Sequence, residues 1–278
     1  LIPKDVASDA SALSEVIAKE ELSVIFITTA LFNGLSEYDA SLLSSLRLLL
    51  FGGEKVSVSP VRKMLSGLGP NKILHVYGPT ETTTYASCQV ISEISSEAVT
   101  IPIGKPLSNT GFYVLNSSKE LVPIGAIGEL YISGSGVSQG YLNREELTAE
   151  RFIANPFKAG ETIYQTGDLV RWLPEGVIEF VGRKDSQVKI RGYRIELGEI
   201  ENVLSEVPGI QGSCVIAKED GVGNKRLVGY VVSEEGLETE AIELALKASL
   251  PDYMIPSLWI PLEGLPLTSN GKLDKKAL

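Results

Sequence analysis

An eight-residue stretch from Tyr77 to Thr84, with the sequence YGPTETTT, gathers side chains that can do chemistry. It contains an aromatic ring, a rigid Gly-Pro turn, several hydroxyls and the carboxylate of Glu81. The ring can stack on a base, the hydroxyls can hydrogen-bond phosphate oxygens, and the carboxylate can bind a hard cation. A polar turn without a function has the same composition, so the stretch alone fits both interpretations.

Three shorter motifs are less specific. TGDL, from Thr166 to Leu169, contains a carboxylate that in a turn normally caps backbone N–H groups. The paired glycines Gly52 and Gly53 follow an apolar run. Asn270-Gly271-Lys272 is first of all a hairpin turn signal with an exposed lysine.

The segment Gly136 to Gly140 matches the GxSxG pattern of a serine hydrolase, but the rest of the chain excludes that class. In that fold the histidine follows the serine, whereas the single histidine, His75, lies upstream. Gly134, Gly136 and Gly140 likewise miss the dinucleotide-binding fingerprint, because Gln139 stands where its third glycine belongs. One histidine also excludes most metalloenzyme mechanisms.

Composition limits the partners and the compartment. A net charge of −10 opposes nucleic-acid binding, and no uncharged apolar run approaches the roughly 18 residues of a membrane span. The two cysteines, Cys88 and Cys214, form no CxxC pair, which favours a reducing cytoplasm. The N-terminus has no initiator Met and no export signal, so we expect a chain cut from something longer.

These motifs need elements to position them, and the first hundred residues predict alternating helices and strands. The pattern predicts a helix over residues 10–17, strands at 23–28, 46–51 and 72–76, and a helix that opens near Ser59. Such alternation predicts a mostly parallel sheet whose ligands bind at the carboxyl ends of the strands. Those ends are Phe26 to Thr29, Leu50 to Glu54 and Val76 to Thr84, which predicts one shared pocket.

Short strands and turns after about Val99 predict a compact, barrel-like β region, with strands at 128–133 and 176–182. A basic stretch then leads into a helix with Leu197, Ile200 and Leu204 on its apolar face. Two strands and a last helix complete a small α+β domain. We therefore predict an α/β protein with a large part at 1–184 and a small domain at 185–278.

The order of the motifs resembles the adenylation domains of nonribosomal peptide synthetases, within the adenylate-forming superfamily. The matching blocks span nearly the whole chain, and the form QVKIRGYRIELGEIE resembles peptide synthetases more than acyl-CoA synthetases or luciferases. The blocks are YGPTETT at 77–83, a long block at 128–152, YQTGDL at 164–169, GRKDSQVKIRGYRIELGEIE at 182–201, LPDYMIP at 250–256 and NGKLDKKAL at 270–278.

The resemblance implies a nucleotide site for ATP and AMP. Tyr77 would stack on adenine, while Asp168 would accept hydrogen bonds from the ribose hydroxyls, with support from Arg183. Thr80 would contact the α-phosphate, and Glu81 would help to bind Mg²⁺. The remaining nucleotide-binding residues implied by the family are Gly52, Gly53, Glu54 and Gly78.

The resemblance also implies a moving small domain. Lys272 would stabilise the charge that develops as the adenylate forms. Asp185 would be the hinge about which this domain then rotates, withdrawing Lys272 and bringing in the loop from Lys189 to Tyr193. The phosphopantetheine thiol of a peptidyl carrier protein would attack the adenylate, and a condensation domain would lie next to it in the full synthetase.

The family's side-chain pocket is implied at the same strand ends. It is mostly apolar and has no charge to meet an ionic substrate, so we expect an aliphatic amino acid, isoleucine first and then valine or leucine. One methylene is worth only about 1–3 kcal/mol, which limits the selectivity. The pocket positions are Phe26, Leu50, Gly52, Val76, Thr84 and Tyr85, with Lys272 below.

Departures from the family pattern leave two alternatives open. His75 stands where Asn is commoner. The family's phosphate loop and its amine-binding Asp are expected before Leu1, so we expect this chain alone to be inactive.

The two alternative functions are another carrier-protein ligase, for an aryl acid or D-alanine, and a non-catalytic remnant that docks a carrier protein. Glu81, Asp168 and Lys272 together favour catalysis.

Overall fold

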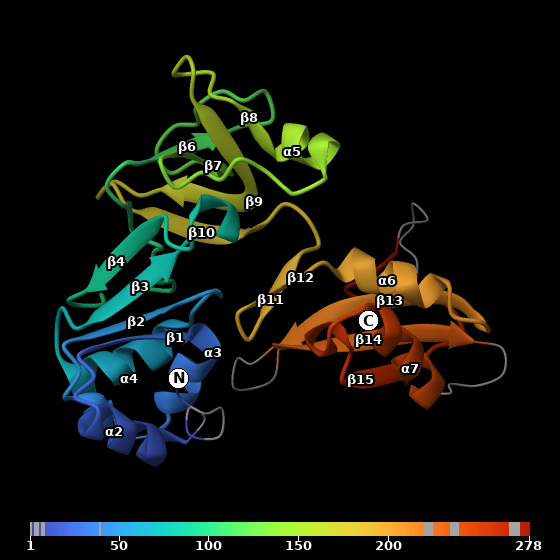
Figure 1. Cartoon of the computed structure of the whole chain (residues 1–278), viewed down its shortest axis with the longest axis horizontal. Coiled ribbons are helices and arrows are strands. Elements are labelled where there is room, and N and C mark those ends of the chain that lie inside the picture. Colours follow the sequence, from blue (N-terminus) through green and yellow to red (C-terminus); the bar gives the residue numbers. More distant parts are fainter. Residues whose placement is uncertain are drawn as a thin grey trace. The chain divides into compact units, whose positions relative to one another are not determined.

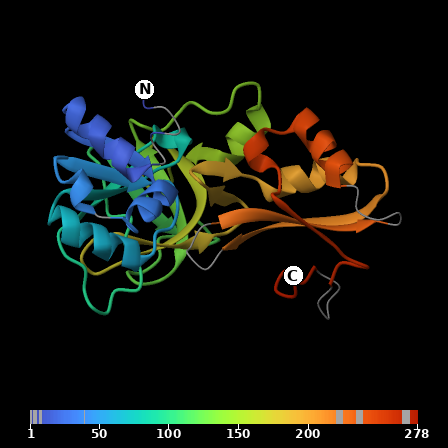
Figure 2. The same cartoon turned by 90° about the horizontal axis from the view of Figure 1, so that it is seen from below.

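A computed structural model describes residues 2, 6, 9–38, 40–219, 225–233, 239–266 and 273–278. The chain divides into two compact units, Leu1–Asp185 (unit 1) and Ser186–Leu278 (unit 2), and each is described by itself (Figure 1, Figure 2). By its contacts Asp185 groups with unit 1. The assignment of 1–184 and 185–278 as the family's large and small domains stays a prediction.

Unit 1 begins with a five-stranded sheet in the order β1-β2-β3-β4-β5. The three predicted strands pair in parallel as expected, whereas the last two strands pair antiparallel, so the sheet as a whole is mixed. The three predicted strands are β1 (Val24–Thr28), β2 (Leu48–Gly52) and β3 (Ile73–Tyr77), and the sheet continues with β4 (Ser87–Ile91) and β5 (Lys105–Pro106).

Helices pack on one face of this sheet (Figure 1). The helix α2 (Ala10–Lys19) is capped by Asp9, whose side chain accepts a hydrogen bond from the Ala12 N–H at 2.8 Å. Its residues at helical spacing are buried together with alternate strand residues such as Leu49 and Phe51. The other elements on the same side are α3 (Thr29–Leu35), the 3₁₀ turn η1 (Ala40–Leu43) and α4 (Val58–Leu68).

A second, antiparallel sheet follows in the order β10-β9-β7-β6, with β8 paired to β9. In the part of the chain that the structure describes, β6 and β10 do not pair with each other, so the predicted barrel-like region is an open sheet. Its strands are β6 (Thr110–Leu115), β7 (Gly128–Gly134), β8 (Phe152–Ala154), β9 (Thr162–Trp172) and β10 (Ile178–Arg183), with α5 (Glu145–Arg151) before β8.

The TGDL motif lies inside the long strand β9, where its backbone is irregular. β9 pairs with β7 on one side and β10 on the other, but the register with β7 skips residues 166–168 and neither ladder includes Gly167. The strand is therefore irregular at this motif: Gly167 has φ +74°, and the register with β7 shifts between Glu129 and Tyr131.

Unit 2 has a two-stranded hairpin and a three-stranded sheet in the order β13-β14-β15. The predicted α+β composition is observed, with α6 and α7 burying their apolar faces in one core with the sheet. The elements are β11 (Val188–Ile190), β12 (Tyr193–Ile195), α6 (Leu197–Ser205), β13 (Ile210–Glu219), β14 (Lys225–Ser233), α7 (Thr239–Ser249), the 3₁₀ turn η3 (Asp252–Met254) and β15 (Leu258–Pro261).

The segment from Lys189 to Tyr193, expected to be a loop, is the tip of the β11–β12 hairpin. Ile190 pairs with Tyr193 across a two-residue turn in which Arg191 and Gly192 both have positive φ, 53° and 82°. The ring of Tyr193 stacks on that of Tyr253 with centroids 4.2 Å apart.

None of the helices in the described part of the chain has the length and apolar character that a membrane span requires.

Candidate functional site

The loop that follows β3 is tied to a second segment far along the chain. It forms a 3₁₀ turn, η2 (Thr80–Thr82), and the Thr83 hydroxyl then donates to the carbonyl of Gly136 at 2.7 Å. The N–H of Ser138 donates to the carbonyl of Glu81 at 2.9 Å. A Cβ on Gly136 would lie 2.9 Å from the Thr82 carbonyl. The glycine of the apparent GxSxG motif therefore permits this close backbone approach.

Three predicted nucleotide-binding residues form one hydrogen-bonded cluster. The hydroxyl of Tyr77 donates to Oδ2 of Asp168, and Nη1 of Arg183 donates to Oδ1 of Asp168 at 2.7 Å. The Asp168 and Arg183 side chains are only 3% and 14% exposed, so this is a buried ion pair. Arg183 stands directly opposite Asp168 in the ladder between β10 and β9. The pairing of the two strands thus places the charges together.

The protonation states of this cluster suit hydrogen bonding to Asp168. Burial raises the pKa of the Tyr77 phenol well above its usual value, and the Asp168 charge raises it further. Burial lowers the pKa of the Arg183 guanidinium, but Asp185 and Asp168 more than offset this, so its pKa lies above the usual value. Tyr77 is therefore a neutral donor and Arg183 a cation at neutral pH.

The predicted hinge residue is bound to the same arginine. Nε and Nη2 of Arg183 donate to Oδ1 and Oδ2 of Asp185 at 2.9 and 2.6 Å. Arg183 also donates Nη1 to the carbonyl of Thr166 at 2.8 Å. A Cβ on Gly167 would lie 2.8 Å from Nη2 of Arg183, so the glycine leaves room for the guanidinium.

Glu81, predicted to bind Mg²⁺, is buried at 7% exposure and has a partner that the sequence did not predict. The hydroxyl of Tyr141 donates to Oε1 of Glu81 at 2.6 Å and lies 3.4 Å from that of Tyr164. Burial, and then the hydrogen bond to Glu81, raise the pKa of Tyr141, which keeps its hydroxyl a donor. Tyr141 lies in the block at 128–152 that resembles the family, and this resemblance was the one indication in the sequence that the residue could belong to the site.

Four predicted pocket residues share one face of the first sheet. Phe26 pairs with Leu50, and Gly52 pairs with Val76, opposite the face that carries the helices. Phe26 is 44% exposed there, and its ring lies 5.6 Å from that of Tyr85 between centroids. These side chains are apolar, and they lie toward the carboxyl ends of the strands, where the pocket was predicted.

Gly52 is required by the packing of two neighbouring strands. A Cβ at this position would lie 2.1 Å from the carbonyl oxygen of Val76, so β2 and β3 approach too closely for any side chain. The next glycine, Gly53, has φ +101°. The carbonyl of Glu54 accepts a hydrogen bond from the Thr29 hydroxyl at 3.3 Å.

The positions of the remaining predicted site residues say less about their function. Thr80 is exposed at the start of η2, and Thr84 is exposed with φ +69°. A Cβ on Gly78 would lie 2.5 Å from the carbonyl of Thr84. Lys272, with Asn270 and Gly271, lies outside the described residues.

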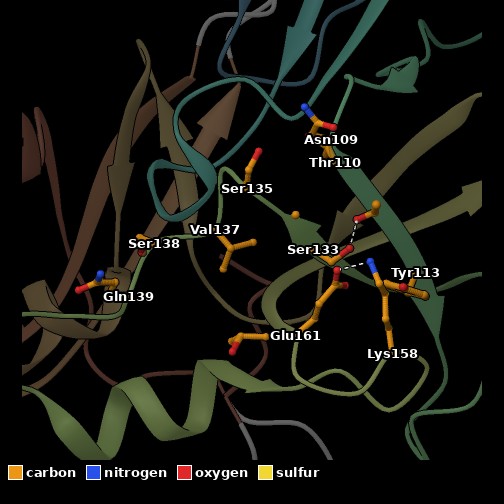
Figure 3. Close-up of a pocket in the computed structure, with 13 residues that line it drawn as sticks. Asn109, Thr110, Tyr113, Ser133, Ser135, Val137, Ser138, Gln139, Lys158 and Glu161 are labelled. Carbon is orange, nitrogen blue, oxygen red and sulfur yellow. Dashed lines mark hydrogen bonds and ion pairs between the residues drawn. The ribbon is translucent and has the colours of Figure 1, made fainter.

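An open pocket of about 710 Å³ lies beside this site, but none of the predicted site residues lines it. Its lining includes Asn109, Ser133 and Ser135, and its two ionic residues, Lys158 and Glu161, pair with each other (Figure 3). The predicted charged residues instead converge in the Asp168 and Glu81 clusters.

Comparison with known proteins agrees with the motifs. Residues 1–142 match the family model described as AMP-binding enzyme, and residues 199–272 match the AMP-binding enzyme C-terminal domain. The chain belongs to the AMP-binding enzyme family. The resemblance stated from the motifs is thereby confirmed, and so is the α/β fold class.

Within this family the chain is similar to nonribosomal peptide synthetases. It is 51% identical to bacitracin synthase 1 of Bacillus licheniformis over 278 residues, which is 100% of this chain and 5% of that protein. It is 49% identical to surfactin synthase subunit 3 of Bacillus subtilis (strain 168) over 270 residues, 97% of this chain and 21% of that subunit. The chain thus spans a small part of these relatives.

A solved structure has a fold similar to that of this chain. Holo-PA1221, described as an NRPS protein containing adenylation and PCP domains bound to a vinylsulfonamide inhibitor, matches with a TM-score of 0.87 and 32% identity. The match covers 97% of this chain and 46% of that one.

Proposed function

We propose that the chain is the nucleotide-binding and side-chain-selecting part of an amino-acid adenylating enzyme in nonribosomal peptide synthesis. The complete enzyme activates an amino acid with ATP as an aminoacyl adenylate, and then transfers it to a phosphopantetheine thiol. One observation carries the proposal: Tyr77, Asp168 and Arg183, which the family resemblance implies as adenine- and ribose-binding residues, form one buried cluster.

Asp168 has the chemistry of a ribose-binding residue. An ionised carboxylate has about four lone-pair sites, and Tyr77 and Arg183 each use one. The remaining capacity suits the two hydroxyls of a ribose. Arg183 offsets the cost of burying the carboxylate, and it holds the side chain in one orientation for the sugar.

Glu81 is a suitable ligand for Mg²⁺. Among the described residues no cluster of three or more His, Cys, Asp or Glu is present. Mg²⁺ is usually bound through one or two carboxylates together with substrate phosphates, so a single glutamate beside an ATP site fits. When bound, the ion would offset the negative charge of the phosphates. Thr80, in the same turn, would contact the α-phosphate.

The apolar face formed by Phe26, Leu50 and Val76 supports an aliphatic substrate. Burying such a side chain against these residues gains roughly 1.5–3 kcal/mol, whereas a charged side chain would lose its hydration without a partner there. We therefore keep the order isoleucine, then valine or leucine.

The partner of unit 2 would be a peptidyl carrier protein with its phosphopantetheine, and a condensation domain would adjoin the full domain. PA1221 is described as containing both adenylation and PCP domains, which supports the first of these partners. Asp185 remains the proposed hinge, and the hairpin at Lys189 to Tyr193 remains the element proposed to serve the thioester step. Lys272 remains the proposed catalytic lysine, and the cytoplasm the proposed compartment.

Amino-acid-dependent ATP–pyrophosphate exchange by the complete adenylation domain tests the proposal. We expect exchange with isoleucine, valine or leucine and little with the other amino acids. Exchange with an aryl acid or D-alanine alone would favour another carrier-protein ligase. A protein that shows no exchange but binds a carrier protein would be the non-catalytic remnant.

A further inference from the structure

The Glu81 carboxylate accepts a hydrogen bond from Tyr141, a residue that the proposed function does not use. Tyr141 donates its hydroxyl to Oε1 of Glu81 at 2.6 Å, a short hydrogen bond to a charged acceptor. The two residues are 60 apart in sequence, and Tyr141 lies in the segment between β7 and α5. The contact is therefore made by tertiary packing.

Tyr141 is itself fixed by its surroundings. Its backbone N–H donates to the Thr148 hydroxyl at 2.9 Å. The preceding Gly140 has φ +133°, and a Cβ there would lie 2.3 Å from a Thr148 methyl group. The Tyr141 ring packs edge-on to Phe152 with centroids 5.4 Å apart, and Phe152 packs on Tyr164. A ring held from both its backbone and its face presents its hydroxyl in one place.

The backbone of Glu81 does not depend on Tyr141. The Ser138 N–H donates to the Glu81 carbonyl, and the neighbouring Thr83 hydroxyl donates to Gly136. Loss of the tyrosine hydroxyl would therefore leave the turn in place and remove one hydrogen bond from the carboxylate. The contact thus acts on the one group that the proposed function assigns to Mg²⁺.

We propose that Tyr141 is a positioning residue, whose hydroxyl fixes the Glu81 carboxylate in the orientation that receives the metal ion of Mg²⁺–ATP. This inference rests on the proposed role of Glu81. Groups that hydrogen-bond to a ligating carboxylate typically contribute 10–100-fold to metal affinity or activity, and we expect an effect of that size.

The test uses Tyr141→Phe in the complete adenylation domain. Binding of a non-hydrolysable ATP analogue is measured by calorimetry over a range of Mg²⁺ concentrations, without turnover. We expect the Mg²⁺ concentration for half-maximal binding to rise by about 10–100-fold. Binding of AMP without metal is expected to stay unchanged, because Tyr77, Asp168 and Arg183 are untouched. An unchanged Mg²⁺ dependence would overturn the proposal.

Tyr164→Phe is the matched control. It removes the same atom from the same cluster, 3.4 Å from the Tyr141 hydroxyl, and leaves the bond to Glu81 in place. We expect its Mg²⁺ dependence to equal that of the unmodified protein. An equal shift in both variants would mean that general packing, rather than the contact with Glu81, controls metal binding.

A double substitution tests whether Tyr141 acts through Glu81, and the unmodified domain tests the proposed function itself. If Tyr141 acts through Glu81, Tyr141→Phe has no further effect in a protein that already carries Glu81→Gln. Independent, multiplying effects of the two substitutions would contradict the inference. An unmodified domain that shows no Mg²⁺-dependent ATP binding would instead contradict the proposed function.

Discussion

Arg183 binds the carboxylate of Asp185 through two parallel hydrogen bonds, from Nε at 2.9 Å and from Nη2 at 2.6 Å. The third side of the same guanidinium contacts Asp168. A rigid arginine fork thus joins the proposed ribose-binding carboxylate to the proposed hinge. A change in one of these carboxylates changes the surroundings of the other.

Arg183→Ala is expected to be strongly destabilising. It leaves the Asp168 carboxylate buried without its cation, which typically costs about 3–5 kcal/mol. Urea unfolding of the complete domain measures this loss. Lys63→Ala is the control, because Lys63 and its partner Glu37 are 48% and 52% exposed, and such pairs contribute about 0–1 kcal/mol. Equal losses in the two variants would contradict the account of a buried pair.

His75 predicts an acid sensitivity of the fold. The imidazole is buried against Phe51 and hydrogen-bonds the carbonyl of Pro102 at 2.8 Å, and burial lowers its pKa from 6.5 to about 4. Above pH 6.5 the imidazole is neutral in both states. Between pH 6.5 and 4 only the unfolded state takes up the proton, so stability falls as the pH falls. The full loss is about 3 kcal/mol.

The measurement compares the 278-residue chain with its His75→Asn variant at pH 7 and pH 5 by chemical unfolding. The unmodified chain should lose roughly 2 kcal/mol more than the variant between these values. His75 is the only histidine, so its imidazole resonances also report the folded-state pKa directly. Identical pH dependence of the two proteins would refute the assignment.

Gly52→Ala is expected to disrupt the substrate face. The added Cβ would lie 2.1 Å from the Val76 carbonyl, so β2 and β3 must separate, at a cost of several kcal/mol. Gly34→Ala is the matched control: Gly34 is exposed in α3 and has no atom within 4 Å of the added Cβ. There alanine should be neutral or stabilising by up to about 1 kcal/mol. Thermal unfolding distinguishes the two, and a tolerated Gly52→Ala would contradict the close approach.

The sequence predicts the first sheet because its strands are apolar runs between helix signals. Leu48 to Gly52 and Ile73 to Tyr77 lie close to the expected ranges. The short helices α3 and α5 were not predicted, since seven residues give too little periodicity to separate them from neighbouring strands.

The site was less predictable than the sheet. Tyr77 and Asp168 are 91 residues apart, so only the family resemblance associated them. The spacing of Tyr141 and Glu81 does not predict their contact, because the contact depends on how the segment before α5 packs. The TGDL motif lies within an eleven-residue strand that pairs on both sides, and a local turn preference does not predict such a strand.

The central claim is that the cluster around Asp168 binds the nucleotide part of an aminoacyl adenylate. Its most direct test is calorimetric titration of an isoleucyl-adenylate analogue into the complete domain and into an Asp168→Asn variant whose folding is verified by circular dichroism. The unmodified domain should bind, and the variant should bind at least about tenfold more weakly, since a hydrogen bond to a charged group contributes about 1.5–3 kcal/mol. Equal affinity in the two proteins, or no binding to the unmodified domain, would contradict the claim.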